Sequence, residues 1–359
     1  MKKILIIVTL IVLTFSKTIF AAESKFEIFE EKISTLTQND KKELFKSYLN
    51  KSGANKKKLY PYLGYLYYNG IGVEKNIDMG VSIYERAVEE DAPLGYYLLG
   101  KHYVENNIDF KKGISLLLKA SDKNSIEATL YIAKVYENGI GVDKDAYYAL
   151  EYYHRASQMG SGEAKFIISQ KLISSGDPSN YKKGVGYLID SANLDNEHAC
   201  DTLQKLYIIP NKILENNPKS HVKYLICSAD NGNIDAIKKV AEYYSKGYIV
   251  MIDNKKSMQY YNKYLTIVKN PKTKEEYETY YKAGIAFIKM ERYRPAVEIL
   301  RTSSTGNIAE ASKALARLYE GEYLGEPDYE KSLNYYNKAK QQGIDTTEDI
   351  LRVQKYIKK

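Results

Sequence analysis

The chain has 359 residues, which is long enough for two globular domains or for one long array of repeats. Hydrophobic residues make up 44% and charged residues 27%, which excludes wholesale disorder and a polytopic membrane protein. Two cysteines exclude a disulfide-dense scaffold and a cysteine-based zinc cluster, and a formal net charge of +8 does not call for a nucleic-acid partner.

Residues 1–22 have the three-part pattern of a secretory signal peptide. Two lysines precede the uncharged run Ile4–Phe15, and Ala21 and Ala22 supply small residues for cleavage. A helix of about 12 residues is about 18 Å long, too short for a bilayer core of about 30 Å. The alternative is an uncleaved anchor in which Ile19 and Phe20 extend the apolar run.

Residues 23–55 are expected to form a helical cap over the array that follows. Residues 24–49 have the apolar periodicity of one or two amphipathic helices. The apolar positions are Phe26, Phe29, Ile33, Leu36, Leu44, Phe45 and Leu49.

The rest of the chain repeats a pattern with a mean period near 36 residues. Tyr67-x-Asn69-Gly70-Ile71-Gly72-Val73 recurs as Tyr136-x-Asn138-Gly139-Ile140-Gly141-Val142. One aligned slot holds Tyr67, Tyr103, Tyr136, Leu172, Tyr207, Tyr244, Phe287 and Tyr319. Such a period is typical of two-helix repeats. The sequence therefore predicts an all-α fold, a right-handed α-solenoid of about eight helix-turn-helix repeats.

Three further columns keep the same register in the second helix of each repeat. The expected N-caps are Asn76, Asp109, Asp145, Asn180, Asn217, Asp253, Arg292 and Asp328. Four residues later, a mostly small column holds Gly80, Gly113, Ala149, Gly184, His221, Ser257, Ala296 and Ser332. A further four residues on, a larger column holds Tyr84, Leu117, Tyr153, Leu188, Leu225, Tyr261, Leu300 and Tyr336. Small residues in the second of these columns would let the two helices of a hairpin approach closely.

The Leu-Gly-x-x-Tyr, Gly-x-Gly-Val and Asn/Asp columns resemble the Sel-1-like repeat family, a relative of the tetratricopeptide. The match is strong at 56–92 and 126–160, fair at 93–125, 234–268 and 308–343, and weak at 163–233. Residues 277–305 look more like a plain tetratricopeptide. The predicted domains are 1–22 signal peptide, 23–55 cap, 56–269 Sel-1-like repeats, 270–344 tetratricopeptide-like and final Sel-1-like repeat, and 345–359 C-terminal capping helix, with Asp345 and Glu348 placed for a capping box.

No motif points to catalysis, a cofactor or a metal. The four histidines lack metal-ligand spacing, and His198 and Cys200 point in different directions on a helix. The Gly-x-Gly pairs lie at helix ends and not after a strand, which argues against a dinucleotide fingerprint. We therefore predict a protein that is not an enzyme, has no cofactor and binds neither metal nor nucleic acid.

Two surface features suggest contact with other proteins. Adjacent tyrosines, such as Tyr152-Tyr153 and Tyr335-Tyr336, would leave one ring exposed for a partner, although the tyrosine excess is equally explained by compositional drift. The residue after the first-helix Gly/Ala slot should line the concave face. That column is Tyr65, Lys101, Lys134, Gln170, Lys205, Glu242, Ile285 and Arg317, with Lys238 and Lys313 one turn earlier. This basic column would attract carboxylates of a partner. The alternative is an ordinary solvated, lysine-rich face.

The predicted partner-binding residues are Tyr65, Tyr68, Asn69, Lys101, Lys134 and Asn138. Asn69 and Asn138 precede the loop glycine, where an amide could hold a partner backbone. The alternative for both is a polar cap of the helix C-terminus.

The resemblance implies a non-catalytic scaffold or adaptor of the Gram-negative cell envelope, periplasmic or associated with the outer membrane or cell surface. Its partners would be envelope or host proteins, with membrane association through a partner and a role in virulence or host-cell interaction. The alternative is a secreted Sel-1-like enzyme with weak β-lactam-binding or β-lactam-hydrolysing activity.

The two cysteines are predicted to form a disulfide. Cys200 falls near the start of a first helix and Cys227 near the end of the second, and antiparallel helices bring such positions together. Export would provide an oxidising compartment. Some secreted Sel-1-like proteins similarly link the helices of a repeat through cysteines. The alternative is two buried thiols that face away from each other.

Overall fold

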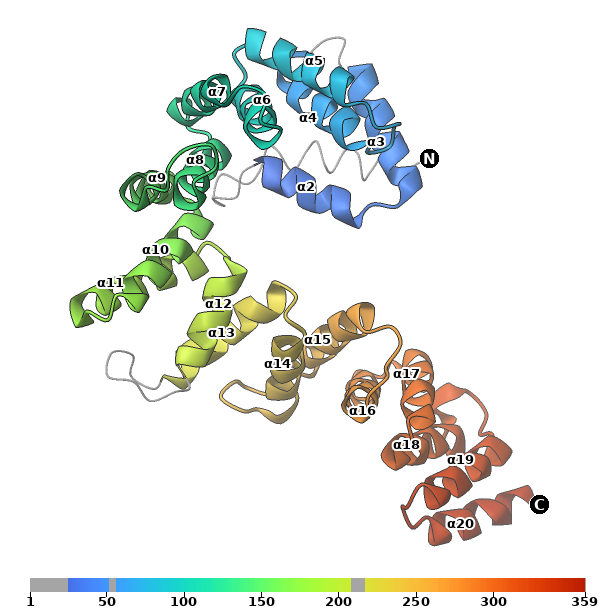
Figure 1. Cartoon of the computed structure of the whole chain (residues 1–359). Helices are drawn as coiled ribbons and strands as arrows, with labels where there is room; N and C mark the ends of the chain where they lie inside the picture. The colour runs from blue at the N-terminus through green and yellow to red at the C-terminus, as the bar shows by residue number, and fades with distance from the viewer. Residues whose placement is uncertain (1–24, 52–55, 208–216, 359) are drawn as a thin grey trace. The chain divides into compact units, whose positions relative to one another are not determined.

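The computed structural model describes residues 25–51, 56–207 and 217–358. Within these ranges the chain forms nineteen α-helices and one short 3-10 helix, without a strand (Figure 1). Consecutive helices pack as hairpins, which confirms the all-α solenoid fold. The chain divides into two compact units, Met1–Ala199 and Cys200–Lys359.

Unit 1 contains two N-terminal helices and four hairpins. Its helices are α2 (Lys25–Thr35), α3 (Gln38–Lys51), α4 (Lys56–Asn69), α5 (Ile77–Glu89), α6 (Pro93–Glu105), α7 (Phe110–Asp122), α8 (Ile126–Asn138), α9 (Ala146–Gln158), α10 (Gly162–Ser174) and α11 (Pro178–Ala192).

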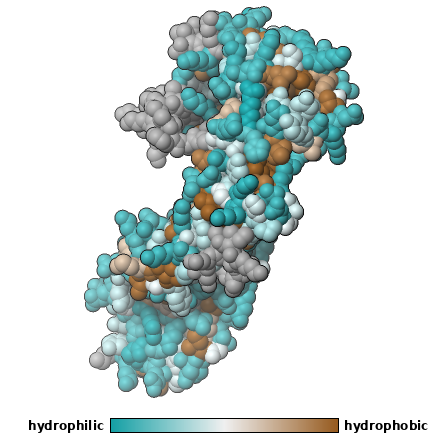
Figure 2. All heavy atoms as spheres, turned by 90° about the vertical axis from the view of Figure 1, so that its left-hand side faces the viewer, coloured by the Kyte–Doolittle hydropathy of each residue, from teal (hydrophilic) through white to brown (hydrophobic). Residues whose placement is uncertain are grey.

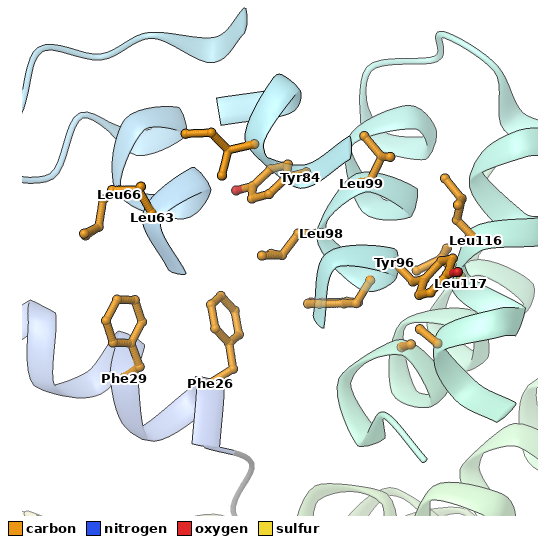
Figure 3. Packing of buried hydrophobic residues seen from close by; sticks show 14 of the residues in the cluster. Phe26, Phe29, Leu63, Leu66, Tyr84, Tyr96, Leu98, Leu99, Leu116 and Leu117 are labelled. Atoms are coloured by element: carbon orange, nitrogen blue, oxygen red, sulfur yellow. The ribbon is translucent and has the colours of Figure 1, made fainter. Parts of the chain in front are cut away.

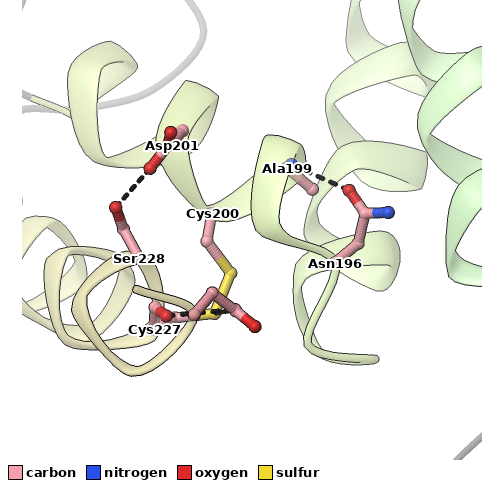
Figure 4. The surroundings of a disulfide bond; sticks show 7 residues. Asn196, Ala199, Cys200, Asp201, Cys227 and Ser228 are labelled. Carbon is pink, nitrogen blue, oxygen red and sulfur yellow. Dashed lines mark hydrogen bonds between the residues drawn. A yellow bond between two sulfur atoms is a disulfide. The ribbon is translucent and has the colours of Figure 1, made fainter. Parts of the chain in front are cut away.

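Unit 2 contains most of α12, three complete hairpins and a final helix. Its helices are α12 (Glu197–Leu206), α13 (Pro218–Asp230), α14 (Ile234–Lys246), α15 (Asn254–Ile267), α16 (Lys274–Lys289), α17 (Tyr293–Thr305), α18 (Ala309–Glu320), η2 (Glu322–Leu324), α19 (Tyr329–Gln341) and α20 (Thr347–Ile357). A disulfide joins Cys200 of α12 to Cys227 of α13, with their Cα atoms 5.8 Å apart (Figure 4).

The small-residue column marks where the two helices of each hairpin touch. A Cβ atom on Gly80 would lie 3.0 Å from the carbonyl oxygen of Gly64, and one on Gly113 would lie 3.0 Å from that of Gly100. All eight residues of the column are buried. His221 is the large exception, and its Nδ1 lies 2.8 Å from the carbonyl oxygen of Gln204. The histidine therefore replaces close backbone contact by a side-chain hydrogen bond.

The larger column forms the centre of the hairpin cores. All eight members are buried at 2% exposure or less. The neighbouring tyrosines stack on the tyrosine of the first helix. Tyr152 stacks on Tyr136 with ring centroids 6.1 Å apart, and Tyr335 stacks on Tyr319 at 5.8 Å. One face of each of these half-buried rings is therefore covered within its own hairpin, and contact of the rest with a partner stays a prediction.

The predicted N-caps are confirmed with one correction. Six Asn or Asp side chains accept a backbone N–H at the predicted position, and Arg292 occupies its N-cap position without a side-chain bond. Asn180 is not a cap, because α11 begins at Pro178 and the side chain of Asp177 accepts from Ser179 N at 2.8 Å. Proline suits the first helical position, where its missing N–H costs nothing.

The inter-helix loops of three repeats share one backbone conformation. Gly72 and Gly141 have φ of 73° and 69°, and Ile249 occupies the equivalent position with φ of 64°. A β-branched residue in the left-handed region is strained by about 1–2 kcal/mol. Repeat geometry thus holds Ile249 in a conformation that glycine adopts without cost.

The N-terminal helices cover the beginning of the array. Phe26 and Phe29 of α2 point toward the helices that carry Leu63, Leu66 and Leu98 (Figure 3). The apolar positions predicted in this region are buried or half-buried except Leu49, which is 43% exposed. Tyr48, one residue earlier on α3, is buried instead and packs edge-on against Phe29.

The C-terminal helix starts two residues later than predicted and has no capping box. Thr346 is its N-cap and makes no side-chain cap bond, while the side chain of Asp345 accepts from Thr347 N at 2.9 Å. The helix is attached by Glu320 of α18, which accepts hydrogen bonds from Arg352 Nε at 2.7 Å and from the hydroxyl of Tyr336 at 2.7 Å.

We expect the attachment of α20 to weaken in acid. The hydrogen bond from Arg352 holds the pKa of Glu320 below its ordinary value. A carboxyl with a lowered pKa stabilises the fold above its unfolded pKa of about 4.3, and this contribution disappears as pH falls through the folded pKa. Urea unfolding should show Glu320→Gln less stable than wild type near pH 7, with the difference vanishing in acid. A difference independent of pH, or the same loss in the exposed control Glu322→Gln, would contradict this assignment.

Candidate protein-binding surfaces

Most cations of the predicted basic stripe are already paired with carboxylates of the same chain. In unit 1, Lys134 Nζ lies 2.9 Å from Glu163, and Lys101 Nζ lies 3.8 Å from Glu105. In unit 2, Lys238 contacts both Asp235 and Glu275, at 2.9 and 2.6 Å, and Lys313 contacts Asp349 at 3.3 Å. Carboxylates of the same chain therefore compensate most of the positive charge of the stripe. This reduces its attraction for the carboxylates of a partner.

The predicted partner residue Tyr65 is occupied within unit 1. Its ring packs edge-on against Phe26 of α2 with centroids 5.1 Å apart, and its hydroxyl donates to Glu30 at 2.7 Å. Burial, together with this hydrogen bond, raises the pKa of Tyr65 above its ordinary value. Helix α2 thus covers the part of the face where Tyr65 was expected to meet a partner.

Tyr68 and the two predicted asparagines also make internal hydrogen bonds. The hydroxyl of Tyr68 lies 3.0 Å from Nδ1 of His102. The amide of Asn69 donates to the carbonyl oxygen of Tyr65, and that of Asn138 donates to the carbonyl oxygen of Lys134, each at 3.0 Å. These bonds are those of a polar cap at a helix C-terminus. Both asparagines are exposed, and their contact with a partner stays a prediction.

The face of the chain shown in Figure 2 is mainly hydrophilic, and hydrophobic side chains reach it as separate patches. One apolar depression in unit 2 is a groove of about 450 Å³ between α16 and α18. Ile285 and Ile288 of α16 face Ala314 and Leu318 of α18 across it. Tyr281, Tyr293, Tyr323 and Ile344 complete its apolar and aromatic walls.

Charged side chains also line this groove. Glu310, Lys313 and Arg317 come from successive turns of α18. Lys313 is paired with Asp349, whereas the exposed guanidinium of Arg317 makes no hydrogen bond or ion pair with any residue that the structure describes. Burial raises the pKa of Tyr281, and the carboxylate of Glu310 adds to the effect. Tyr281 therefore remains a neutral hydroxyl that can donate or accept a hydrogen bond.

This arrangement suits a peptide segment better than a reacting substrate. An apolar side chain would fit among the isoleucines, and a neighbouring carboxylate would meet the bidentate donor fork of Arg317. Among the described residues, no group of three His, Cys, Asp or Glu side chains lies close enough to hold a metal ion. The described helices include none with both the length and the apolar character to cross a bilayer.

The sequence did not predict this groove, but some of its lining residues belong to the predicted inner-face column. Ile285 and Arg317 both belong to the column predicted to line the inner face, and Ile285 is the apolar member of that mostly polar column. Tyr293 and Tyr323 were not predicted, because they come from the start of α17 and from η2, outside the column.

The hairpins, their small-residue contacts and the groove between first helices define a helical-repeat protein. Comparison with known families identifies the repeat: residues 62–91, 94–125, 126–161, 234–263 and 309–344 match the Sel1 repeat. The chain therefore carries Sel1 repeats over these five stretches, in agreement with the resemblance found in the sequence. Repeat proteins of this kind are generally scaffolds that bind other proteins.

Solved structures of several bacterial proteins resemble the chain. A Sel1 repeat protein from Oxalobacter formigenes is 22% identical, with a TM-score of 0.48, covering 64% of this chain and 100% of that one. The protein c5321, a protective antigen of uropathogenic Escherichia coli with an SLR fold, is 17% identical, with a TM-score of 0.40 and coverage of 90% and 80%. The immunity protein Pa5087 from Pseudomonas aeruginosa is 19% identical, with a TM-score of 0.40 and coverage of 58% and 82%. No curated protein matches the chain.

Proposed function

We propose that this protein is a non-catalytic scaffold that binds other proteins through the groove between α16 and α18. The observation that carries the proposal is an apolar groove of about 450 Å³ beside an unpaired arginine. Strong contacts in interfaces usually combine a buried apolar side chain with a charged group that pairs with the partner. A carboxylate of the ligand would pair with Arg317 in this way. The ligand would be a peptide segment with an apolar side chain and a nearby carboxylate.

We further propose that the scaffold works in the bacterial cell envelope as an adaptor. Support comes from the signal-peptide pattern of residues 1–22, which lie outside the described residues. A role in virulence or host-cell interaction rests on the resemblance to exported Sel-1-like proteins alone. The partners would accordingly be envelope or host proteins.

A crosslinking pull-down from intact envelopes tests the proposal. Arg317→Glu together with Ile285→Asn should remove at least one captured protein, because the first change reverses the charge of the groove and the second places an amide in its apolar wall. Lys289→Glu is the matched control, since it reverses an exposed charge of α16 that does not line the groove. Lys101→Glu with Lys134→Glu tests the face predicted in unit 1. An unchanged profile in the groove variant, with its circular dichroism spectrum intact, would exclude the groove as the binding site.

A further inference from the structure

The loop between α14 and α15 exposes a run of apolar side chains. Met251 is 88% exposed, Ile252 63%, Tyr248 55% and Ile249 50%. The loop stands out from the ends of the two helices (Figure 1). Scattered exposed apolar residues are normal, but a contiguous run of this kind marks an interaction site.

Two other loops of the same chain serve as internal controls. The loops that begin at Gly70 and Gly139 have the same length, from the first glycine to the N-cap, and similar positive φ at their two turn positions. Where they carry Glu74-Lys75 and Asp143-Lys144, this loop carries Met251-Ile252. The loop geometry is therefore compatible with charged residues, and the apolar pair is not required by the fold.

The second turn position gives an independent sign of selection for an apolar tip. A Cβ atom on Gly72 would lie 2.1 Å from the carbonyl oxygen of Lys41, and one on Gly141 would lie 2.4 Å from the ring of Phe110, so those loops have no room for a side chain. Ile249 has the same left-handed backbone but extends into solvent. A strained backbone conformation whose side chain does not pack in the core indicates a functional role.

The charge around the tip also changes sign. Residues 69–79 and 138–148 each carry a formal charge of −1, whereas the equivalent residues 246–256 carry +2. Lys246, Lys255 and Lys256 are exposed on both sides of the apolar run. Asp253, the acidic residue of this segment, is engaged as the N-cap of α15. The tip is thus apolar, and its flanks are basic.

We infer that this loop, residues 246–256, is a docking site for the surface of a membrane that contains anionic lipid. Apolar side chains at the tip would enter the interface between headgroups and acyl chains, with the ring of Tyr248 at headgroup depth. The three lysines would contact lipid phosphates, whose negative surface potential attracts basic segments. The positive charge on both sides of the tip favours this occupant over an apolar protein groove, which would not select for lysines.

The absence of tryptophan from the whole chain allows a site-specific test. Tyr248→Trp places the single tryptophan of the chain at the tip, in protein purified from bacterial envelopes. We expect its emission to shift to the blue with phosphatidylcholine vesicles containing phosphatidylglycerol, and the shift to decrease at high salt because salt screens the lysines. With vesicles of phosphatidylcholine alone, the shift should be at least severalfold smaller.

Matched variants separate the loop from the rest of the chain. Ile249→Gly, Met251→Glu and Ile252→Lys together give this loop the glycine and the acidic-basic pair of the loops that begin at Gly70 and Gly139, which we call the sister loops. In this sister-loop background the tryptophan at position 248 should show no blue shift, and the protein should remain folded. Tyr147→Trp, at a 75% exposed position of α9, should also show none. Arg317→Glu, which tests the groove between α16 and α18, should leave the blue shift of the tip unchanged. Failure of the groove proposal can therefore be distinguished from failure of the membrane proposal.

Three results would overturn the inference. They are no blue shift in the wild-type loop background, a shift that persists in the sister-loop background, and an equal shift without anionic lipid. If vesicles give no shift while the sister-loop variant loses a crosslinked protein, the loop is a protein-docking site and not a membrane contact.

Discussion

Replacing Tyr153 by alanine should lower the free energy of unfolding of unit 1 by about 3–5 kcal/mol, the range found for truncation of large buried aromatic residues. The ring is fully buried in the third hairpin, beside Ala149 and Ala156. Its hydroxyl also donates to Glu137 at 2.6 Å, and Lys171 of the next repeat contacts the same carboxylate at 2.5 Å. The substitution therefore creates a cavity and removes a hydrogen bond within the hairpin.

Two variants separate these contributions. Tyr153→Phe keeps the ring and should cost about 1–2 kcal/mol, because Lys171 still partners the carboxylate of Glu137. Tyr147→Ala, at an exposed position on the same helix, should change the free energy of unfolding by less than about 0.5 kcal/mol. Urea unfolding followed by circular dichroism provides the measurement. A Tyr153→Ala protein as stable as wild type would mean that the large column does not form the core.

The repeat architecture could be predicted because its signals are local. Each hairpin needs a cap, a small residue one turn later and a large residue after another turn, and these spacings lie within a single helix. The five stretches with strong or fair agreement are the five that match the Sel1 repeat. The Asn180 error arose because two capping residues, Asp177 and Asn180, lie three positions apart, and the fixed φ of Pro178 selects the first.

Side-chain pairing across helices could not be predicted from the same columns. Lys134 and Glu163 come from different repeats, and their contact depends on the packing of α8 against α10. The tyrosine pairs show the same limit. Spacing places Tyr153 in the core, but only packing shows that Tyr152 stacks on Tyr136.

Some residues that line the candidate groove belong to the predicted inner-face column, and others could not be predicted. Ile285 and Arg317 follow from the inner-face column, because successive first helices present equivalent positions to the same side. Tyr323 lies in η2, an element that the repeat pattern does not specify, and Ile344 follows the end of α19. The exposure of the tip at Tyr248–Ile252 could not be predicted, because a run of apolar residues in a sequence does not by itself show whether the residues are exposed.

Loss of the disulfide should destabilise unit 2 by about 3.5 kcal/mol. Cys200 and Cys227 close a loop with a sequence separation of 27, and a cross-link of this length removes about that much conformational entropy from the unfolded chain. The bond joins α12 to α13 in the hairpin where His221 stands in the small-residue column (Figure 4). A covalent link is therefore placed where close helix packing is least regular.

Urea unfolding of wild type and of Cys200→Ala with Cys227→Ala measures the effect, with alanine chosen because the side chain of Cys200 is fully buried. Reductant should lower the stability of wild type to that of the variant and leave the variant unchanged. Tyr153→Ala should remain equally destabilising with or without the bond, because sites in different units add independently. Mass spectrometry of the native protein, isolated from its own cells and alkylated without reductant, should show no alkylated cysteine. Two alkylated cysteines would show that the pair is reduced in the cell, and the bond would then contribute nothing to the stability of the native protein.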